Sequence, residues 1–424
     1  MFKKLFTILL LCILSANLTA CGGNETPQPT EPEPVIETII VEQVLEPPVE
    51  AEPEGLLPGR IAIVTNIFEQ NAEEYISARH IQDKFGAEYI IHRTWPVQFA
   101  QEGEMMIEIL QEIADDPDVR VLIINQAVMN TNAAVEAFRE RRDDVFIIYV
   151  RPMEVGYFYP HRGDRINQYE ITIKNADLIL NTNNAAVGYH LVNQAIAMGA
   201  ETIIHYSSLR HMAVPHLAVR RDGIRDAAEA AGIAFYDLDL YDRLIQSSVL
   251  IATTQDVDRR VNRYGTNIVF ISTFCRQQAP IMSQVIRSGA LYILLCCPSP
   301  FHTIPNALGL ASCQSEALNN FSSAEIIEAA IVAIAEHDMT GRIATSPLSD
   351  AMLFTYTAVE YGIKWMHGEV SKDEIDLEVL SQIMADIIAA QTGVEGLGVQ
   401  LARHEFEGEI FSNFILVSQD FLVY

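Results

Sequence analysis

The sequence lacks the short motifs by which several common enzyme classes are recognised. It contains no GxSxG, no GxxxxGK[ST] and no HExxH, and GVEGLG near residue 393 has neither the GxGxxG spacing nor a preceding strand. Basic residues are scarce, because 28 Lys and Arg stand against 56 Asp and Glu and leave a formal charge of −28. Such a chain is poorly suited to bind nucleic acid through its phosphates. We therefore expect a protein that is not an enzyme and needs no cofactor.

Long apolar runs are absent after the first twenty residues, so no later segment is expected to span a membrane. Residues 1–20 combine Lys3 and Lys4 with an apolar run and then small residues, the pattern of a signal peptide. LTAC followed by two glycines resembles the bacterial lipobox. This resemblance implies cleavage before Cys21 and a lipid such as palmitate on its thiol, which would hold the chain at the extracytoplasmic face of the cell membrane. The alternative is an uncleaved anchor or a buried helix.

Residues 21–59 follow as a tether. From residue 22 this stretch has nine Glu, eight Pro and no Lys or Arg, so it cannot bury enough apolar surface to fold alone. Proline and uniform charge both favour an extended chain. We expect a disordered spacer between the membrane and the folded part.

Cysteine and histidine give no clear metal site, because no CxxC is present. Outside the cytoplasm the four remaining cysteines, Cys275, Cys296, Cys297 and Cys313, allow a bridge such as Cys297 to Cys313 or free buried thiols. His205, His211 and His216 would share a metal only if a loop folded them together, so we expect no metal.

From Arg60 the chain alternates short apolar runs with helical patterns, which indicates an α/β fold with parallel sheets covered by helices. A break after residue 182 and a restart at 201 favour two doubly wound lobes over one sheet of nine strands. Residues 153–174 show little periodicity and read as a long loop. We predict a first lobe over 60–182, a second over 183–305, and a segment over 306–424 that returns to the first lobe. The predicted strands are 60–66, 88–95, 119–126, 145–152 and 176–182, then 201–208, 233–240, 266–273 and 291–297.

Polar side chains gather where these strands end. Ligands bind at the carboxyl ends of the strands in open parallel sheets, and amides, hydroxyls and arginines suit a small polar or anionic ligand. Arg210 and His211 have an equally good alternative role in fixing their own loop. The candidate ligand-binding residues are Asn66, Arg93, Trp95, Asn125, Gln126, Arg151 and Asn181 in the first lobe, and Ser207, Ser208, Arg210, His211, Thr273, Phe274, Pro298 and Ser299 in the second.

Two stretches carry a family resemblance. DLILNTNNAAVGYHLVNQAIAMGA and RRDGIRDAAEAAGI are similar to the first crossover and a second-lobe helix of the type I periplasmic-binding proteins. NTN with HYSSLRHM and CCPSPFH resembles an uncharacterised family of bacterial lipoproteins known by a domain of unknown function. The resemblance implies two lobes joined by a multi-strand hinge, with crossings at Asn181 to Asn183, near Pro300 to Leu310 and near Ala344 to Asp350.

The same resemblance implies a function. Hinge closure on a solute would make the chain a binding lipoprotein that feeds an ABC importer. The alternatives are a sensory lipoprotein of the same fold that signals to a membrane receptor and, less favoured, a surface enzyme.

Overall fold

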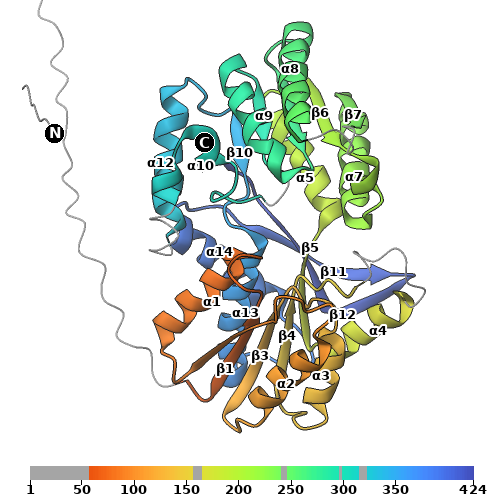
Figure 1. Ribbon diagram of the computed structural model, residues 1–424, viewed down its shortest axis with the longest axis vertical. Coiled ribbons are helices and arrows are strands. Elements are labelled where there is room, and N and C mark those ends of the chain that lie inside the picture. The colour runs from red at the N-terminus through yellow and green to blue at the C-terminus, as the bar shows by residue number, and fades with distance from the viewer. Residues whose placement is uncertain (1–56, 156–164, 240–245, 296–297, 315–321) are drawn as a thin grey trace, which may run out of the picture. The chain divides into compact units, whose positions relative to one another are not determined.

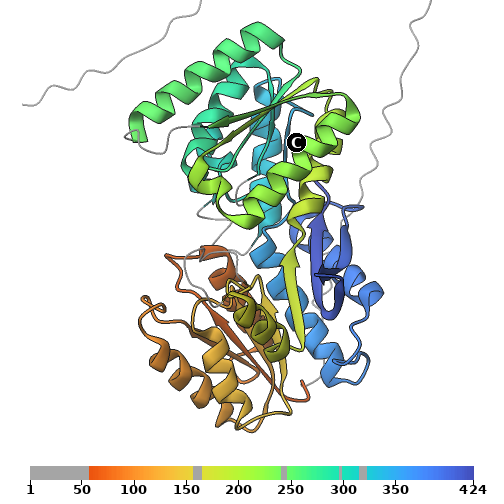
Figure 2. The ribbon, with the colours of Figure 1, turned by 90° about the vertical axis from the view of Figure 1, so that its right-hand side faces the viewer.

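The computed structural model describes residues 57–155, 165–239, 246–295, 298–314 and 322–424. These residues form two sheets, each with helices on both faces (Figures 1 and 2). The predicted α/β class with two lobes is confirmed. The signal sequence, Cys21 and most of the acidic tether lie outside the described residues.

The first lobe is built on a seven-stranded sheet in which five strands from one edge run in the order β2-β1-β3-β4-β5, all parallel. A hairpin from the end of the chain adds β12 parallel to β5, and then β11 antiparallel to β12. Across the sheet, the strands are β11 (Val399–Phe406), β12 (Glu409–Gln419), β5 (Leu178–Thr182), β4 (Phe146–Val150), β3 (Val119–Asn125), β1 (Arg60–Thr65) and β2 (Ile90–Thr94).

Successive side chains along the strands of this sheet point to opposite faces and so belong to two different apolar cores. Ile61 and Ile63 of β1 belong to the core on one face, while Ala62 and Val64 belong to the core on the other. Helices α1 (Ala72–Phe85), α13 (Asp350–Met366) and α14 (Leu377–Thr392) contribute to the first core. Helices α2 (Gly103–Ala114), α3 (Thr131–Arg139) and α4 (Arg165–Asn175) contribute to the second.

The second lobe repeats this order as β7-β6-β8-β9-β10, and β13 closes the sheet antiparallel to β10. Its strands are β6 (Thr202–Ser207), β7 (Ala234–Asp239), β8 (Ile268–Ser272), β9 (Leu291–Ile293), β10 (Ile343–Thr345) and β13 (Leu422–Val423). Its helices are α5 (Asn184–Ala197), α6 (Leu209–Met212), α7 (Pro215–Ala231), α8 (Gln246–Tyr264), α9 (Cys275–Ser288), α10 (Ile304–Leu308) and α12 (Ser323–Glu336). Two lobes with one strand order are the arrangement expected from duplicated βα units.

In the described residues the chain passes between the two sheets three times, after β5, after β10 and after β12. The side chain of Asp350 joins these three connections. Its Oδ1 accepts a hydrogen bond from Gln419 Nε2 at 2.8 Å, and its Oδ2 accepts one from Thr182 Oγ1. The Asn183 amide also donates to Val417 O at 2.7 Å. We call Thr182, Asp350 and Gln419 the hinge cluster.

Two expectations about the hinge and lobe boundaries are wrong. No crossing occurs near Pro300 to Leu310 in the described residues, because Ile304 packs in the second lobe and the chain continues there through α12 and β10. The return to the first lobe therefore comes after Thr345 instead of at residue 306. β10 has only three residues, too few to give a recognisable apolar pattern. The crossing near Ala344 to Asp350 does occur.

The segment 153–174, predicted as a loop, also differs, because α4 occupies Arg165–Asn175. Tyr169 of this helix is buried against Phe414 of β12, with ring centroids 6.4 Å apart. A partner from the far end of the chain stabilises this helix, and the local sequence does not reveal that partner.

Candidate ligand-binding site

The predicted residues of the first lobe lie at the carboxyl edge of its sheet, as their positions after the strands require. Asn66 and Asn125 are buried at the ends of β1 and β3, and Trp95 is buried just after β2. Gln126 and Arg151 are half-buried after β3 and β4. Arg93 lies within β2 and is exposed, while Asn181 Oδ1 accepts a local bond from the Thr182 amide at 2.9 Å. The exposed Arg93 is therefore not part of this buried group.

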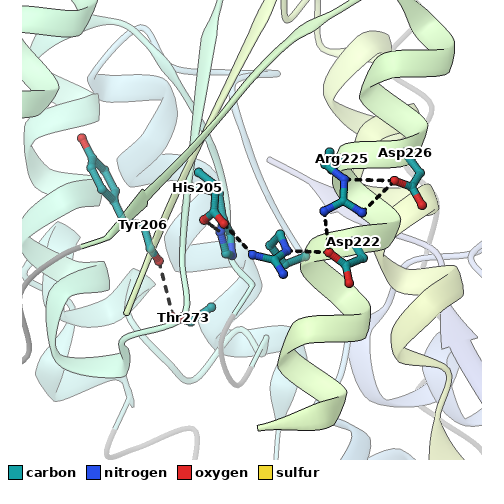
Figure 3. A network of polar contacts seen from close by, with 8 residues as sticks. His205, Tyr206, Asp222, Arg225, Asp226 and Thr273 are labelled. Atoms are coloured by element: carbon teal, nitrogen blue, oxygen red, sulfur yellow. Dashed lines mark hydrogen bonds and ion pairs between the residues drawn. The ribbon is translucent and has the colours of Figure 1, made fainter. Parts of the chain in front are cut away.

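In the second lobe, the structure brings together the side chains after β6 and β8. His211 Nδ1 lies 2.8 Å from Thr273 Oγ1, and the His211 ring packs against that of Phe274, with centroids 4.2 Å apart and planes tilted by 31°. Ser208 caps α6 by accepting from the His211 amide at 3.2 Å. The Thr273 amide donates to Tyr206 O at 3.0 Å, a contact drawn in Figure 3. Ser207 is buried beside this group, and Arg210 is exposed on α6.

Two carboxyl groups that the sequence analysis missed lie at the start of α1. Glu74 is fully buried, and its Oε1 accepts from the Asn66 amide at 2.6 Å. Glu73 Oε1 accepts from Ser299 Oγ at 2.5 Å, and Glu73 Oε2 lies 3.9 Å from His302 Nδ1. Ser299 follows β9 of the second lobe, next to the half-buried Pro298, so this contact joins the strand-end groups of both lobes. The sequence signal was an acidic pair in the first turn of the helix that follows β1, which reads as an ordinary helix start.

Burial controls the charge of Glu74. It raises the pKa of this carboxyl to about 7, although the Asn66 amide and the positive charge of Arg151 act in the opposite direction. On the second lobe, burial lowers the pKa of His216 on α7 to about 4, with Arg220 and Arg151 adding to the effect. At neutral pH His216 is uncharged and Glu74 is partly protonated.

The backbone at the ends of β3 and β4 takes an uncommon conformation. Gln126 has a φ of 58° and Arg151 a φ of 51°, both in the left-handed region. Each amide still extends the sheet, since Gln126 N donates to Val150 O at 2.6 Å and Arg151 N to Leu180 O at 2.8 Å. Such conformations persist where the surrounding structure enforces them, and they cluster at binding sites.

Several buried polar atoms at this edge have no hydrogen-bond partner among the described residues. They are Asn66 Oδ1, Trp95 Nε1 and Asn125 Nδ2, two donors and one acceptor from neighbouring strand ends, together with Glu74 Oε2 of α1. Leaving such groups unpaired is costly. The edge can therefore offer hydrogen bonds of both directions to a polar molecule.

His205 has a structural role. Its Nδ1 lies 2.7 Å from Asp237 Oδ1 on the adjacent strand, and Arg221 of α7 bonds the other oxygen of Asp237 at 2.7 Å. Figure 3 shows this network continuing along α7 through Asp222, Arg225 and Asp226. Burial alone would raise the pKa of Asp237, but hydrogen bonds from His205 and Arg221 lower it.

Metal and cysteine chemistry find no support in the part of the chain that the structure describes. No group of three His, Cys, Asp or Glu side chains there is placed to hold a metal ion. Cys313 is a free thiol, and Cys296 and Cys297, with the predicted bridge from Cys297 to Cys313, lie outside the described residues. Among the described helices none is long and apolar enough to cross a membrane.

Replacing Glu74 with glutamine should make stability less dependent on pH. The pKa of Glu74 in the folded protein, about 7, exceeds the ordinary 4.5. The wild type therefore has the full stability contribution of the protonated carboxyl group below pH 4.5 and loses it as the pH rises through 7. The Gln variant has no such loss, and its amide oxygen can still accept from Asn66. We expect it to equal the wild type near pH 4.5 and to exceed it by about 2 kcal/mol at pH 8.

Urea unfolding at both pH values measures this difference. The exposed Glu69→Gln is the matched control and should change little at either pH. An equal effect of Glu74→Gln at pH 4.5 and pH 8 would show that burial does not hold the proton on Glu74.

Comparison with known proteins gives relatives and a family. An uncharacterised protein of Treponema pallidum (strain Nichols) is 24% identical over 237 residues, which cover 54% of this chain and 92% of the relative. A second uncharacterised protein of that organism is 24% identical over 184 residues, 43% of this chain and 79% of the relative.

Among solved structures, a Clostridium difficile 630 protein named "Putative transcriptional regulator" matches with a TM-score of 0.74 and 18% identity, over 87% of this chain and all of that one. It shares the fold with this chain. A sugar ABC transporter protein of Actinomyces odontolyticus ATCC 17982 matches less well, with a TM-score of 0.45 and 10% identity, over 74% and 84% of the two chains.

Both sheets have the same strand order, in which the second strand of the lobe lies at the edge beside the first, and the third, fourth and fifth follow. This order and the three passages between the sheets confirm the expected type I periplasmic-binding architecture. The family described as "Protein of unknown function (DUF3798)" matches residues 60–344, which hold all the strands of both sheets except the C-terminal hairpin and β13. The chain belongs to this family of unknown function.

Proposed function

We propose that this protein is an extracytoplasmic lipoprotein that binds a small polar solute between its lobes and presents it to an ABC importer. The observation that carries the proposal is the meeting of strand-end groups from both lobes at the start of α1. Glu73 there contacts Ser299, and Glu74 contacts Asn66. Ligands of doubly wound sheets bind at such edges.

The hinge cluster and the unpaired polar atoms support the same proposal. The carboxylate of Asp350, on one connection between the lobes, accepts hydrogen bonds from Thr182 and Gln419 on the other two. These bonds fix the point about which the lobes would rotate. The buried donors of Trp95 and Asn125 offer hydrogen bonds that a polar solute would complete. Thr182 and Asn183 form the first of the connections on which closure would turn.

Mass spectrometry of the denatured protein tests solute binding. The chain from residue 22 onward, purified without lipid, should release one small polar molecule, and adding that molecule back should raise the melting temperature with concentration. Finding no bound molecule and no stabilisation by a broad metabolite set would refute the proposal.

The lipid anchor and the partner need separate measurements. Labelled palmitate should enter the full-length chain and be lost in Cys21→Ser. Crosslinking on intact cells should then recover a transporter permease, whereas recovery of a membrane receptor would favour the sensory alternative.

A further inference from the structure

The guanidinium of Arg151 is in an unusual position for so acidic a protein. It is half-buried, yet it forms no hydrogen bond or ion pair with any residue in the described ranges. Arg139, another part-buried arginine of the first lobe, pairs with Asp177 at 2.7 Å. Arg403 instead bonds the carbonyl oxygens of Ser412 and Ile375, and Arg120 lies over the Trp365 ring. With twice as many acidic as basic residues in the chain, a part-buried cation without a hydrogen-bonded carboxylate calls for a specific explanation.

The backbone holds Arg151 firmly where it is. Its amide is bonded to Leu180 O of β5, and its φ of 51° turns the chain out of the sheet directly after β4. The neighbouring Gln126 is fixed in the same way, since its carbonyl also accepts from the Met153 amide at 2.8 Å. The side chain therefore starts from a rigid position at the edge where the strand-end groups gather.

The charge of Arg151 reaches both lobes. It acts on Glu74 of α1 in the first lobe and on His216 of α7 in the second, where Arg220 acts as well. A negative group beside the guanidinium of Arg151 would be attracted to its charge.

We propose that Arg151 binds a carboxylate of the solute, so the ligand class is a hydroxylated or amide-bearing carboxylic acid instead of a neutral sugar. This inference rests on the proposed function. A guanidinium presents two parallel N–H groups that match a carboxylate. A phosphate dianion would suit the place less well, because it carries two charges and the carboxyl groups of Glu73 and Glu74 lie at the same edge.

Matched ligand pairs test the inference. Galacturonate with galactose, glucuronate with glucose, and N-acetylglutamate with N-acetylglutamine each compare an acid with its neutral counterpart, and glucose 6-phosphate represents phosphate. Thermal shift followed by calorimetry on the chain from residue 22 onward should show at least one acid binding tenfold or more tightly than its neutral partner. Arg151→Gln should weaken that binding at least tenfold, and Arg151→Lys should weaken it less.

Arg79→Gln serves as the control. Arg79 is exposed on α1, and its replacement removes the same charge from the same lobe. It should leave the affinity unchanged. Neutral sugars bound as tightly as the acids, a co-purified molecule without an acidic group, or stronger binding of the phosphate would each overturn the carboxylate inference and leave solute binding standing. No binding of any pair and no co-purified molecule would overturn both.

Discussion

Replacing Gly188 with alanine should destabilise the protein by about 3 kcal/mol, although alanine is the better helix former by about 1 kcal/mol. Gly188 lies on α5 where that helix meets α7. A Cβ added there would sit 2.6 Å from Arg220 O and 2.9 Å from the Ile224 amide nitrogen, both backbone atoms that cannot rotate away. The two helices would have to separate, and the packing of the apolar core to which Leu191 and Ile224 both belong would loosen.

Urea unfolding of the chain from residue 22 onward measures this loss. Gly398→Ala is the matched control, because the nearest atom to its added Cβ is Asp420 Oδ2 at 3.7 Å, an ordinary contact. The control should stay within about 0.5 kcal/mol of the wild type. If Gly188→Ala is as stable as the control, the close approach of α5 and α7 is not required for the fold.

Asp350→Ala should also cost about 3 kcal/mol, because it removes the carboxylate that accepts from Thr182 and Gln419. Hydrogen bonds to charged groups are stronger than those between neutral groups. The carboxylate also lies in the first turn of α13, where the helix dipole favours negative charge. The variant should therefore melt at a lower temperature and bind its solute more weakly, since the hinge cluster would no longer hold its three connections together.

The exposed Asp373→Ala is the control for the loss of one negative charge. Asp350→Asn should fall between Asp350→Ala and the wild type, because its amide keeps one acceptor oxygen. An Asp350→Ala protein with wild-type unfolding and wild-type affinity would rule out the hinge cluster as a support for the lobes.

The fold could be predicted from sequence because buried parallel strands carry strong local signals. Every strand from β1 to β9 was predicted from its apolar run, and its bounds agree within a few residues. The misses share a physical cause. α4 and β10 are stabilised by contacts with distant segments, Phe414 for α4 and β9 with β13 for β10, which leave little mark on the local sequence.

The candidate site was less accessible to sequence reasoning. Their positions after strands correctly located Asn66, Gln126 and Arg151 at the carboxyl edge of the first sheet. The same reasoning could not distinguish the exposed Arg93 from the buried Trp95. Glu73 and Glu74 were missed because the sequence of a first helical turn does not reveal that its carboxyl groups are buried. Whether the predicted residues touch a solute stays a prediction.

The short strand β13 has a consequence for the order in which the chain can fold. Leu422 and Val423 complete the second sheet beside β10, and Tyr424 is buried with its amide bonded to Ile343 O at 3.0 Å. The first sheet likewise needs β12 beside β5. Neither sheet is complete until β12 and β13 have been synthesised, and pairing over so long a sequence separation is slow. This delay suits a chain that must stay unfolded while it is carried across a membrane, as the proposed function requires.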